Sequence, residues 1–174
     1  MDSVWGELEH EAERALWADF AATFGFRAGT EPSDWPAIDE PVPSLTWDLA
    51  QVFAAGDRFT ELARPVAQVV CDVLRACTVP DESVIHHDWV HPSVVFRPHR
   101  VIRVDDVANW ETSLFPNGDY SIFVACDLAF GVLGHPWEQS LCFFGAPAVE
   151  AVTEVNTGRL TTLLRRDGQP TSIP

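Results

Sequence analysis

Three apolar segments in the second half of the chain, separated by very short connections, constrain the fold more than any other feature. Residues 120–125, 129–133 and 139–144 are rich in β-branched and aromatic side chains, and only the stretches CDLA and GHPWE connect them. Connections this short join neighbouring antiparallel strands, because parallel strands need a much longer crossover. The spacing therefore predicts an antiparallel meander in the C-terminal half.

Other segments show the period of strands or of helices. Alternation in SLTWDLA (44–50) and the β-branched runs at 84–90 and 93–97 predict three more strands. Apolar residues at helical spacing over 5–24 and 59–77 predict two helices, and Gly145 and Pro147 open a third helix that should reach about Arg166. The fold class is therefore α+β: an antiparallel β-sheet with about three helices packed on one face.

The length of 174 residues fits a single domain that spans residues 1–174. The Pro-rich segment at 27–43, RAGTEPSDWPAIDEPVP, has neither period and predicts an extended arm over the domain, with Trp35 and Ile38 as anchors. Residues 167–174 are expected to form a frayed tail.

Acidic residues far outnumber basic ones, with 26 Asp and Glu against 11 Lys and Arg, a net charge of −15. Such a surface repels phosphate backbones and anionic lipids, which argues against nucleic acid and membranes as partners. A basic protein or a cationic small molecule is compatible with this charge, although excess acid also serves solubility alone.

The compartment follows from the N-terminal stretch and from the cysteines. The first residues are acidic and lack an unbroken apolar core, unlike a signal peptide, and no window approaches about 18 apolar residues. Cys71, Cys77, Cys126 and Cys142 show no CxxC pairing and lie in apolar runs, which is typical of small buried hydrophobes. We expect a reduced, cytoplasmic protein.

Polar and aromatic side chains gather in four stretches in or beside the predicted strands. They are TWD (46–48), HHDWVHP (86–92), FPNGDY (115–120) and GVLGHPWEQ (131–139). A sheet could bring these four stretches together.

The histidines of HHDWVHP suggest a metal site at first sight. On a helix His87 and His91 would share a face suited to zinc, but Pro92 and the β-branched neighbours favour a strand. There the two would stand about 13 Å apart, too far to share one ion, so we expect no metal. His86 and Asp88 would share a strand face, where Asp88 could orient a histidine; alternatively, Asp88 caps a turn and His86 is solvated.

The stretch GHPWE combines the groups that a general acid–base pocket requires. Pro136 restricts the backbone at His135, Trp137 supplies an apolar wall, and desolvation by that wall would raise the pKa of Glu138. The alternative is a rigid hairpin tip in which Glu138 pairs with an arginine such as Arg97.

Two further acidic residues, Asp48 and Asp119, lie in or beside predicted strands. Asp48 faces away from the apolar side of its predicted strand, and as a buried carboxylate it would need a partner such as Arg97 or His135. In FPNGDY the Asn-Gly pair is first a turn signal, and Asp119 and Tyr120 are expected to be structural.

Long stretches of the sequence resemble a known bacterial family, domain-of-unknown-function family 2716. They are EPxPSLTWDL, DWVHPSVVF, FPNGDYSIF and the unusual FGVLGHPWEQSLCFFG, within a similarity that runs from Trp17 to about Leu164. His86 and His87 fall just before the matching part. The resemblance implies no activity, since the family's biochemistry is unassigned.

Two hypotheses of function follow. The first is a small soluble enzyme or ligand-binding protein without an organic cofactor. Its polar groups would be Asp48, His91, His135 and Glu138, in a pocket lined by Trp47, Trp89 and Trp137, with Asp88, Arg97 and Tyr120 as further ligand contacts. The second is an acidic protein, resembling bacterial immunity proteins in size and charge, that masks a basic partner. Convergence of the four polar groups in one pocket would favour the enzyme.

Overall fold

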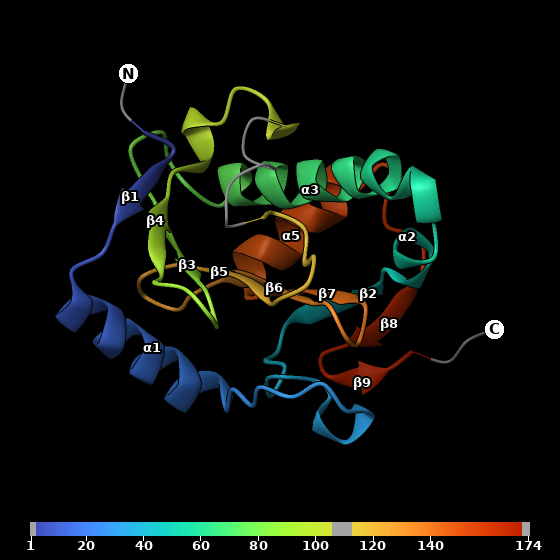
Figure 1. Cartoon of the computed structure of the whole chain (residues 1–174), viewed down its shortest axis with the longest axis horizontal. Coiled ribbons are helices and arrows are strands. Elements are labelled where there is room, and N and C mark those ends of the chain that lie inside the picture. Colours follow the sequence, from blue (N-terminus) through green and yellow to red (C-terminus); the bar gives the residue numbers. More distant parts are fainter. Residues whose placement is uncertain (1–2, 106–112, 172–174) are drawn as a thin grey trace.

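A computed structural model describes residues 3–105 and 113–171 and confirms the α+β class (Figure 1). The described residues form an antiparallel sheet of nine strands in the order β1-β4-β3-β5-β6-β7-β2-β8-β9. The strands are β1 (Trp5–Glu7), β2 (Ser44–Asp48), β3 (Val84–His87), β4 (Val94–Phe96), β5 (Ser121–Val124), β6 (Gly131–His135), β7 (Ser140–Phe144), β8 (Leu163–Arg166) and β9 (Gln169–Pro170). The helices are α1 (His10–Phe24), α2 (Ala50–Phe53), α3 (Phe59–Ala76) and α5 (Ala146–Val155).

The predicted meander is confirmed in β5, β6 and β7, which are neighbours in the sheet. Ser121 pairs with Gly134 across β5 and β6, and Gly134 pairs with Leu141 across β6 and β7. The strands predicted at 84–90 and 93–97 form the β3–β4 hairpin, in which Ile85 pairs with Val95. Successive side chains of a strand point to opposite faces of the sheet, so the apolar residues of these strands can be buried on both faces.

The two faces of the sheet are covered by different helices. Figure 1 shows α3 and α5 above the sheet and α1 below it. On the α3/α5 face, Phe123 and Val132 pack in one core, while Ile122 and Leu133, their neighbours in sequence, pack against α1 and the Pro-rich arm in a second core. The helices therefore divide between both faces instead of packing on one, because strands that are apolar on both sides need two covers.

The predicted first helix is shorter than expected. Trp5 lies in β1, opposite Phe96 of β4, and helix α1 begins only at His10. Burial explains the difference: Trp5 is almost fully buried, and its ring lies 4.7 Å from that of Phe96, which helical geometry at this position would not provide. The predicted end is confirmed, since Gly25 adopts the left-handed conformation (φ 60°) that ends many helices.

The prediction of a last helix reaching Arg166 is wrong. Helix α5 ends at Val155, and residues Leu163–Arg166 form β8, which pairs with β2. Strand β8 covers an edge of β2 that would otherwise be open, and this pairing outweighs the local helical spacing. Within the segment expected to be frayed, Gln169 and Pro170 form β9, and residues 172–174 lie outside the described part.

The Pro-rich arm (27–43) lies on the α1 side of the sheet. Ile38 is fully buried there, as predicted, together with Ala37, whereas Trp35 is half-buried. Within the arm, Arg27 donates to the Asp39 carboxylate at 2.9 Å and so joins its first residue to a residue near its end. Among the residues that the structure describes, no helix has the length and apolar character needed to cross a membrane.

Candidate functional site

The residues predicted to form one site lie in several places. His135, Glu138 and Trp137 lie on the α1 face of the sheet, and Asp88 and His91 lie at the end of the β3–β4 hairpin. Asp48 and Trp47 belong to β2, near the start of α2, and Arg97 follows β4. The four predicted polar groups therefore do not converge in one pocket.

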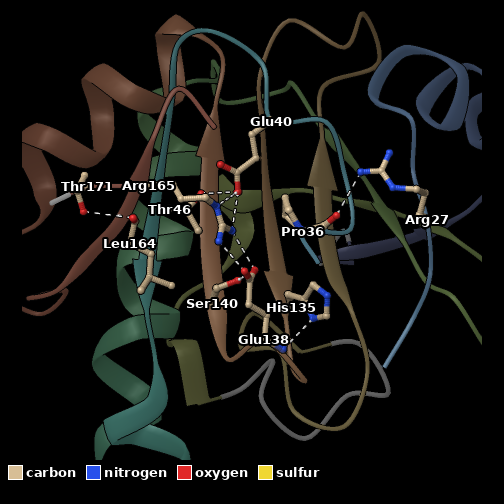
Figure 2. A network of polar contacts seen from close by, with 10 residues as sticks. All are labelled: Arg27, Pro36, Glu40, Thr46, His135, Glu138, Ser140, Leu164, Arg165 and Thr171. Carbon is tan, nitrogen blue, oxygen red and sulfur yellow. Dashed lines mark hydrogen bonds and ion pairs between the residues drawn. The ribbon is translucent and has the colours of Figure 1, made fainter. Parts of the chain in front are cut away.

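Glu138 lies in a buried network of charges that centres on Arg165 of β8. Figure 2 shows the Arg165 guanidinium between Glu40 of the arm and Glu138 of the β6–β7 turn. It donates to Glu138 at 2.5 and 2.9 Å and to Glu40 at 2.8 and 3.0 Å. Ser140 donates to Glu138 at 2.6 Å, and Thr46 donates to Glu40 at 2.8 Å. We call these five residues the Arg165 network.

The Arg165 network fixes the charge state of its members. Burial by itself would raise the pKa of Glu138, but the hydrogen bonds from Arg165 and Ser140 outweigh it and lower that pKa. Burial would likewise lower the pKa of Arg165, but the two carboxylates outweigh it and raise that pKa. Glu138 is thus a firmly ionised carboxylate, contrary to the expectation of a raised pKa.

The arginine partner of Glu138 is therefore Arg165 and not Arg97. Arg97 donates instead to the carbonyl of Ser3 and lies against Gly6 of β1. Sequence reasoning missed Arg165 because it placed residue 165 in a helix, and only the β2–β8 pairing brings Thr46 opposite Arg165.

His135 lies beside the Arg165 network in an aromatic environment. Its ring centroid lies 4.8 Å from that of Tyr120, 5.8 Å from Trp35 and 6.0 Å from Trp137. Nδ1 accepts a hydrogen bond from the backbone N–H of Glu138 at 3.2 Å, and Nε2 is buried without a partner among the described residues. Burial lowers the pKa of His135 to about 4, so the imidazole is neutral at pH 7.

Asp48 and the predicted tryptophans have separate environments. The Asp48 carboxylate accepts a hydrogen bond from the backbone N–H of Ala50 at 2.7 Å, at the start of α2. Trp47 packs against the core on the α3/α5 face, whereas Trp137 packs against the core on the other face. Trp89 is 54% exposed. A pocket walled by all three tryptophans is not assembled.

Two of the four polar stretches do meet, around a cavity of about 150 Å³ where β3 ends and β5 begins. The register that pairs His86 of β3 with Phe123 of β5 brings the HHDWVHP and FPNGDY stretches together. The cavity, called the His86 cavity below, is lined by His86, Asp88, His91, Ser113, Phe115, Asn117, Asp119, Tyr120 and Ser121.

Each aspartate of the His86 cavity braces a turn with one oxygen. Oδ1 of Asp88 accepts from the backbone N–H groups of Val90 and His91 at 2.8 and 2.6 Å, and Nδ1 of His91 lies 3.2 Å from it. Oδ1 of Asp119 accepts from the backbone N–H of Tyr120 at 2.7 Å. Within the described residues, Oδ2 of either carboxylate has no hydrogen-bond partner.

His86 is the most unusual residue of the cavity. Its side chain is 1% exposed, and neither ring nitrogen has a hydrogen-bond partner among the described residues. The ring packs edge-on against Phe123 and Trp5, with centroids 4.6 and 6.0 Å away. Burial lowers the pKa of His86 to about 4, against the opposing effect of Asp88, so this imidazole is also neutral at pH 7.

Asp119 differs from Glu138 in the direction of its pKa shift. Burial and the neighbouring charge of Asp88 raise the pKa of Asp119, although the hydrogen bond from Tyr120 opposes them. Sequence reasoning treated Asp119 as structural because it follows a turn, which Gly118 confirms with a φ of 86°. The shared strand face of His86 and Asp88 was the available signal for this site.

Thiol and metal chemistry find little support in the described residues. Burial raises the pKa of Cys71 and of Cys77 to about 11, and it also raises the pKa values of Cys126 and Cys142, so none of these thiols is an activated nucleophile. Cys126 is exposed, unlike the buried position expected for it. No three His, Cys, Asp or Glu side chains of the described ranges are grouped so that they could hold a metal ion.

Comparisons with known proteins identify similar sequences of unassigned activity. A family model described as "Protein of unknown function (DUF2716)" matches residues 7–149. The chain is 24% identical over 151 residues to the "Uncharacterized protein YxiI" of Bacillus subtilis (strain 168), a match that covers 85% of this chain and 91% of the relative. No solved structure matches the chain significantly.

Proposed function

We propose a function for this chain, which belongs to the DUF2716 family of proteins of unknown function: it binds a small polar ligand in the His86 cavity. The observation that carries the proposal is His86, a fully buried imidazole that lines the cavity with both ring nitrogens unpartnered among the described residues. Buried polar groups in proteins are nearly always hydrogen-bonded, so an exception beside a cavity points to a ligand or solvent partner.

Energetics support the same conclusion. A buried polar atom that lacks its hydrogen bond costs about 1–3 kcal/mol of stability. A phenylalanine at this position would avoid the cost, since its apolar ring could contact Phe123 and Trp5 without a hydrogen-bonding atom. A ligand that exchanges hydrogen bonds with the imidazole offsets the cost in the bound state.

The cavity also has the polarity of a binding site. Phe115 supplies an apolar wall, while Asp88 and Asp119 each present one oxygen that has no partner among the described residues. The volume of about 150 Å³ is roughly that of five water molecules in the liquid. It suits a compound of few atoms, or one end of a larger compound, since whole drug-sized ligands occupy about 300–1,000 Å³.

The proposal includes acid–base chemistry in this cavity. Asp119, whose pKa is raised, holds a proton more readily than an ordinary aspartate, while His86, whose pKa is lowered to about 4, offers a neutral ring nitrogen that is a weaker base than a free imidazole. Perturbed pKa values that gather in a cleft are typical of functional sites. In this proposal Asp88 is a ligand contact, as predicted, and His91, predicted as an acid–base group, is a ligand contact as well. His86 and Asp119 take the acid–base role predicted for His135 and Glu138. Tyr120 contributes its backbone only, because its hydroxyl exchanges hydrogen bonds with Gly29 on the α1 side of the sheet.

The test uses three small probes of different charge: ethylammonium, N-ethylurea and acetate. Each is titrated into ¹⁵N-labelled protein, with the amides of Val90, His91 and Tyr120 as reporters because their N–H groups donate to the cavity carboxylates. At least one probe should shift these amides in the parent protein and not in His86→Phe.

A matched control is His87→Phe, since His87 is equally buried but faces α1, where its ring stacks on Trp17 at 4.5 Å. In His87→Phe the probes should shift the amides of Val90, His91 and Tyr120 as they do in the parent protein. No response of the parent protein to any probe, or an undiminished response in His86→Phe, would overturn the proposal.

A further inference from the structure

We infer that the ligand of the His86 cavity binds through a cationic nitrogen group, a primary ammonium or a guanidinium. This inference rests on the proposed function and names the chemical class of its ligand. The feature that carries it is the part of the lining that the structure describes: two carboxylates and an imidazole that has no hydrogen-bond partner there, with no Arg or Lys among these residues to balance the charge.

The charged groups among the described lining residues are negative. Asp88 is buried and Asp119 half-buried, yet none of the 11 arginines lies among the described residues that line the cavity. The His91 side chain is half-exposed, and its Nδ1 already lies 3.2 Å from Oδ1 of Asp88. The remaining polar lining groups, such as Asn117 and Ser121, are neutral.

The hydrogen-bonding capacity points to the same class. Oδ2 of Asp88 and Oδ2 of Asp119 have no partner among the described residues and can only accept when ionised, and a neutral imidazole offers one more acceptor. A group with several N–H donors satisfies these acceptors together. A carboxylate or phosphate ligand would meet repulsion, and a neutral ligand would leave the charge uncompensated.

Electrostatics would strengthen binding of a cation. Burial is the main cause of the raised pKa of Asp119, and the neighbouring charge of Asp88 raises it further, so the two carboxylates repel each other when both are ionised. A cation placed between them converts this repulsion into two attractions. The net charge of −15 over the whole chain adds a long-range attraction that brings cations to the protein.

The same cationic group can come from a free small molecule or from an arginine or lysine side chain of a basic protein. Trp89 and Val90 lie in the turn between the lining residues Asp88 and His91, and both are exposed (54% and 69%), with the Trp89 ring packed against Phe26 at 5.8 Å. An exposed tryptophan in the turn that carries two lining residues is a feature by which a protein ligand would gain affinity over a free cation.

The experiment compares probes that differ in charge at nearly constant shape. N-ethylguanidinium, ethylammonium and the neutral N-ethylurea are titrated against the intact protein at low salt, with the amides of Val90, His91 and Tyr120 as reporters. The two cations should bind at least about tenfold more tightly than the urea, because a charge-assisted hydrogen bond contributes about 1.5–3 kcal/mol. Asp119→Asn should lower the affinity for each cation about tenfold and leave the affinity for N-ethylurea unchanged.

The matched control for Asp119→Asn is Asp127→Asn. The Asp127 carboxylate also accepts a backbone hydrogen bond within a turn, from Ala129 at 3.0 Å, but it lies outside the cavity lining. This control should change cation affinity by less than about twofold. Equal affinity for N-ethylurea and the cations, or tighter binding of acetate, would overturn the cationic ligand while leaving the proposed cavity in place. No response to any probe would overturn both.

A second experiment distinguishes a free small molecule from the side chain of a basic protein as the source of the cation. The blocked peptide acetyl-Gly-Arg-Gly-amide is titrated into the parent protein and Trp89→Ala. If the partner is a protein, the peptide should bind more tightly than N-ethylguanidinium, and Trp89→Ala should remove only that gain. Equal binding of the two would support a free small molecule, and exclusion of the peptide would do the same.

Discussion

Two groups of histidine and carboxylate side chains lie on opposite faces of the sheet and have different surroundings. His135 and Glu138 lie beside a third group, Arg165, which pairs with the carboxylate and lowers its pKa. His86 and Asp119 line a cavity whose described lining residues include no arginine, and the pKa of Asp119 is raised. An arginine from a distant strand, which the local motif does not reveal, therefore separates the two carboxylates: the pKa of Glu138 is lowered by Arg165, and the pKa of Asp119 is raised by burial.

The largest effect should follow from removing the cation of the Arg165 network. Arg165→Met leaves Glu40 and Glu138 buried, at 1% and 9% exposure, without their counter-charge, and should lower the free energy of unfolding by about 3–5 kcal/mol. Urea denaturation followed by tryptophan fluorescence measures this loss. The neighbouring Arg166→Met replaces an exposed arginine of the same strand and should cost less than about 0.5 kcal/mol. Equal losses would contradict the network's role as a brace.

Taken per side chain, the next largest effect is a fall of stability in mild acid, which both regions share. The pKa values of His86, His87 and His135 are lowered from 6.5 to about 4, so the unfolded chain takes up protons between these pH values that the folded chain does not. Stability should therefore decrease as pH falls from 6.5 to 4, by about 2–3 kcal/mol for each histidine.

The measurement is the midpoint of urea unfolding between pH 7 and pH 5. In this range the histidines of the unfolded chain take up protons while ordinary carboxylates stay ionised, so the change in midpoint reports the histidines. His135→Phe should flatten the pH dependence by the share of one histidine. His10→Phe, at a side chain that is 81% exposed, should leave it unchanged. A pH dependence that is the same in His135→Phe as in the parent protein would show that His135 titrates normally.

A smaller effect is expected from neutralising the carboxylate of the brace. Because the pKa of Glu138 is lowered in the folded state, its charge stabilises the protein above the ordinary glutamate pKa of 4.5, and this contribution is lost as pH falls through the lowered pKa. Glu138→Gln should lower the free energy of unfolding at pH 7 by about 1–2 kcal/mol. The difference from the parent protein should shrink in acid, and a constant difference would mean that packing, not charge, is lost.

The smallest effect has the opposite sign and belongs to the cavity. The pKa of Asp119 is raised, so its contribution is most favourable below the ordinary aspartate pKa of 3.8 and is lost as pH rises through the raised value. Asp119→Asn keeps an oxygen for the Tyr120 amide and should stabilise the protein at pH 7 by a few tenths of a kcal/mol, since solvent screens this partly exposed group. A clear loss of stability would make Asp119 a brace like Glu138.

The sequence predicted the local parts of both regions and missed the contacts that distinguish them. The meander and the β3–β4 hairpin follow from alternation and short connections, which are local signals. The spacing of Leu160, Leu163 and Leu164 fits a helix, so β8 and the position of Arg165 could not be predicted without the pairing partner in β2. The spacing of His86 and Asp88 predicted that they share one face of a strand. The turn that carries Asp119 lies beside them only because β3 pairs with β5, which the local sequence does not indicate.

Strand β2 has an implication for how the molecule is made. Its two neighbours, β7 and β8, come from residues 140–144 and 163–166, so during synthesis β2 leaves the ribosome long before either partner exists. Both of its edges then remain open until nearly the whole chain has been made, and an open apolar strand is prone to associate with other chains. A chain that stops before residue 163 would keep one of these edges unpaired and would also lack Arg165, so we expect such fragments to aggregate even though their meander is intact.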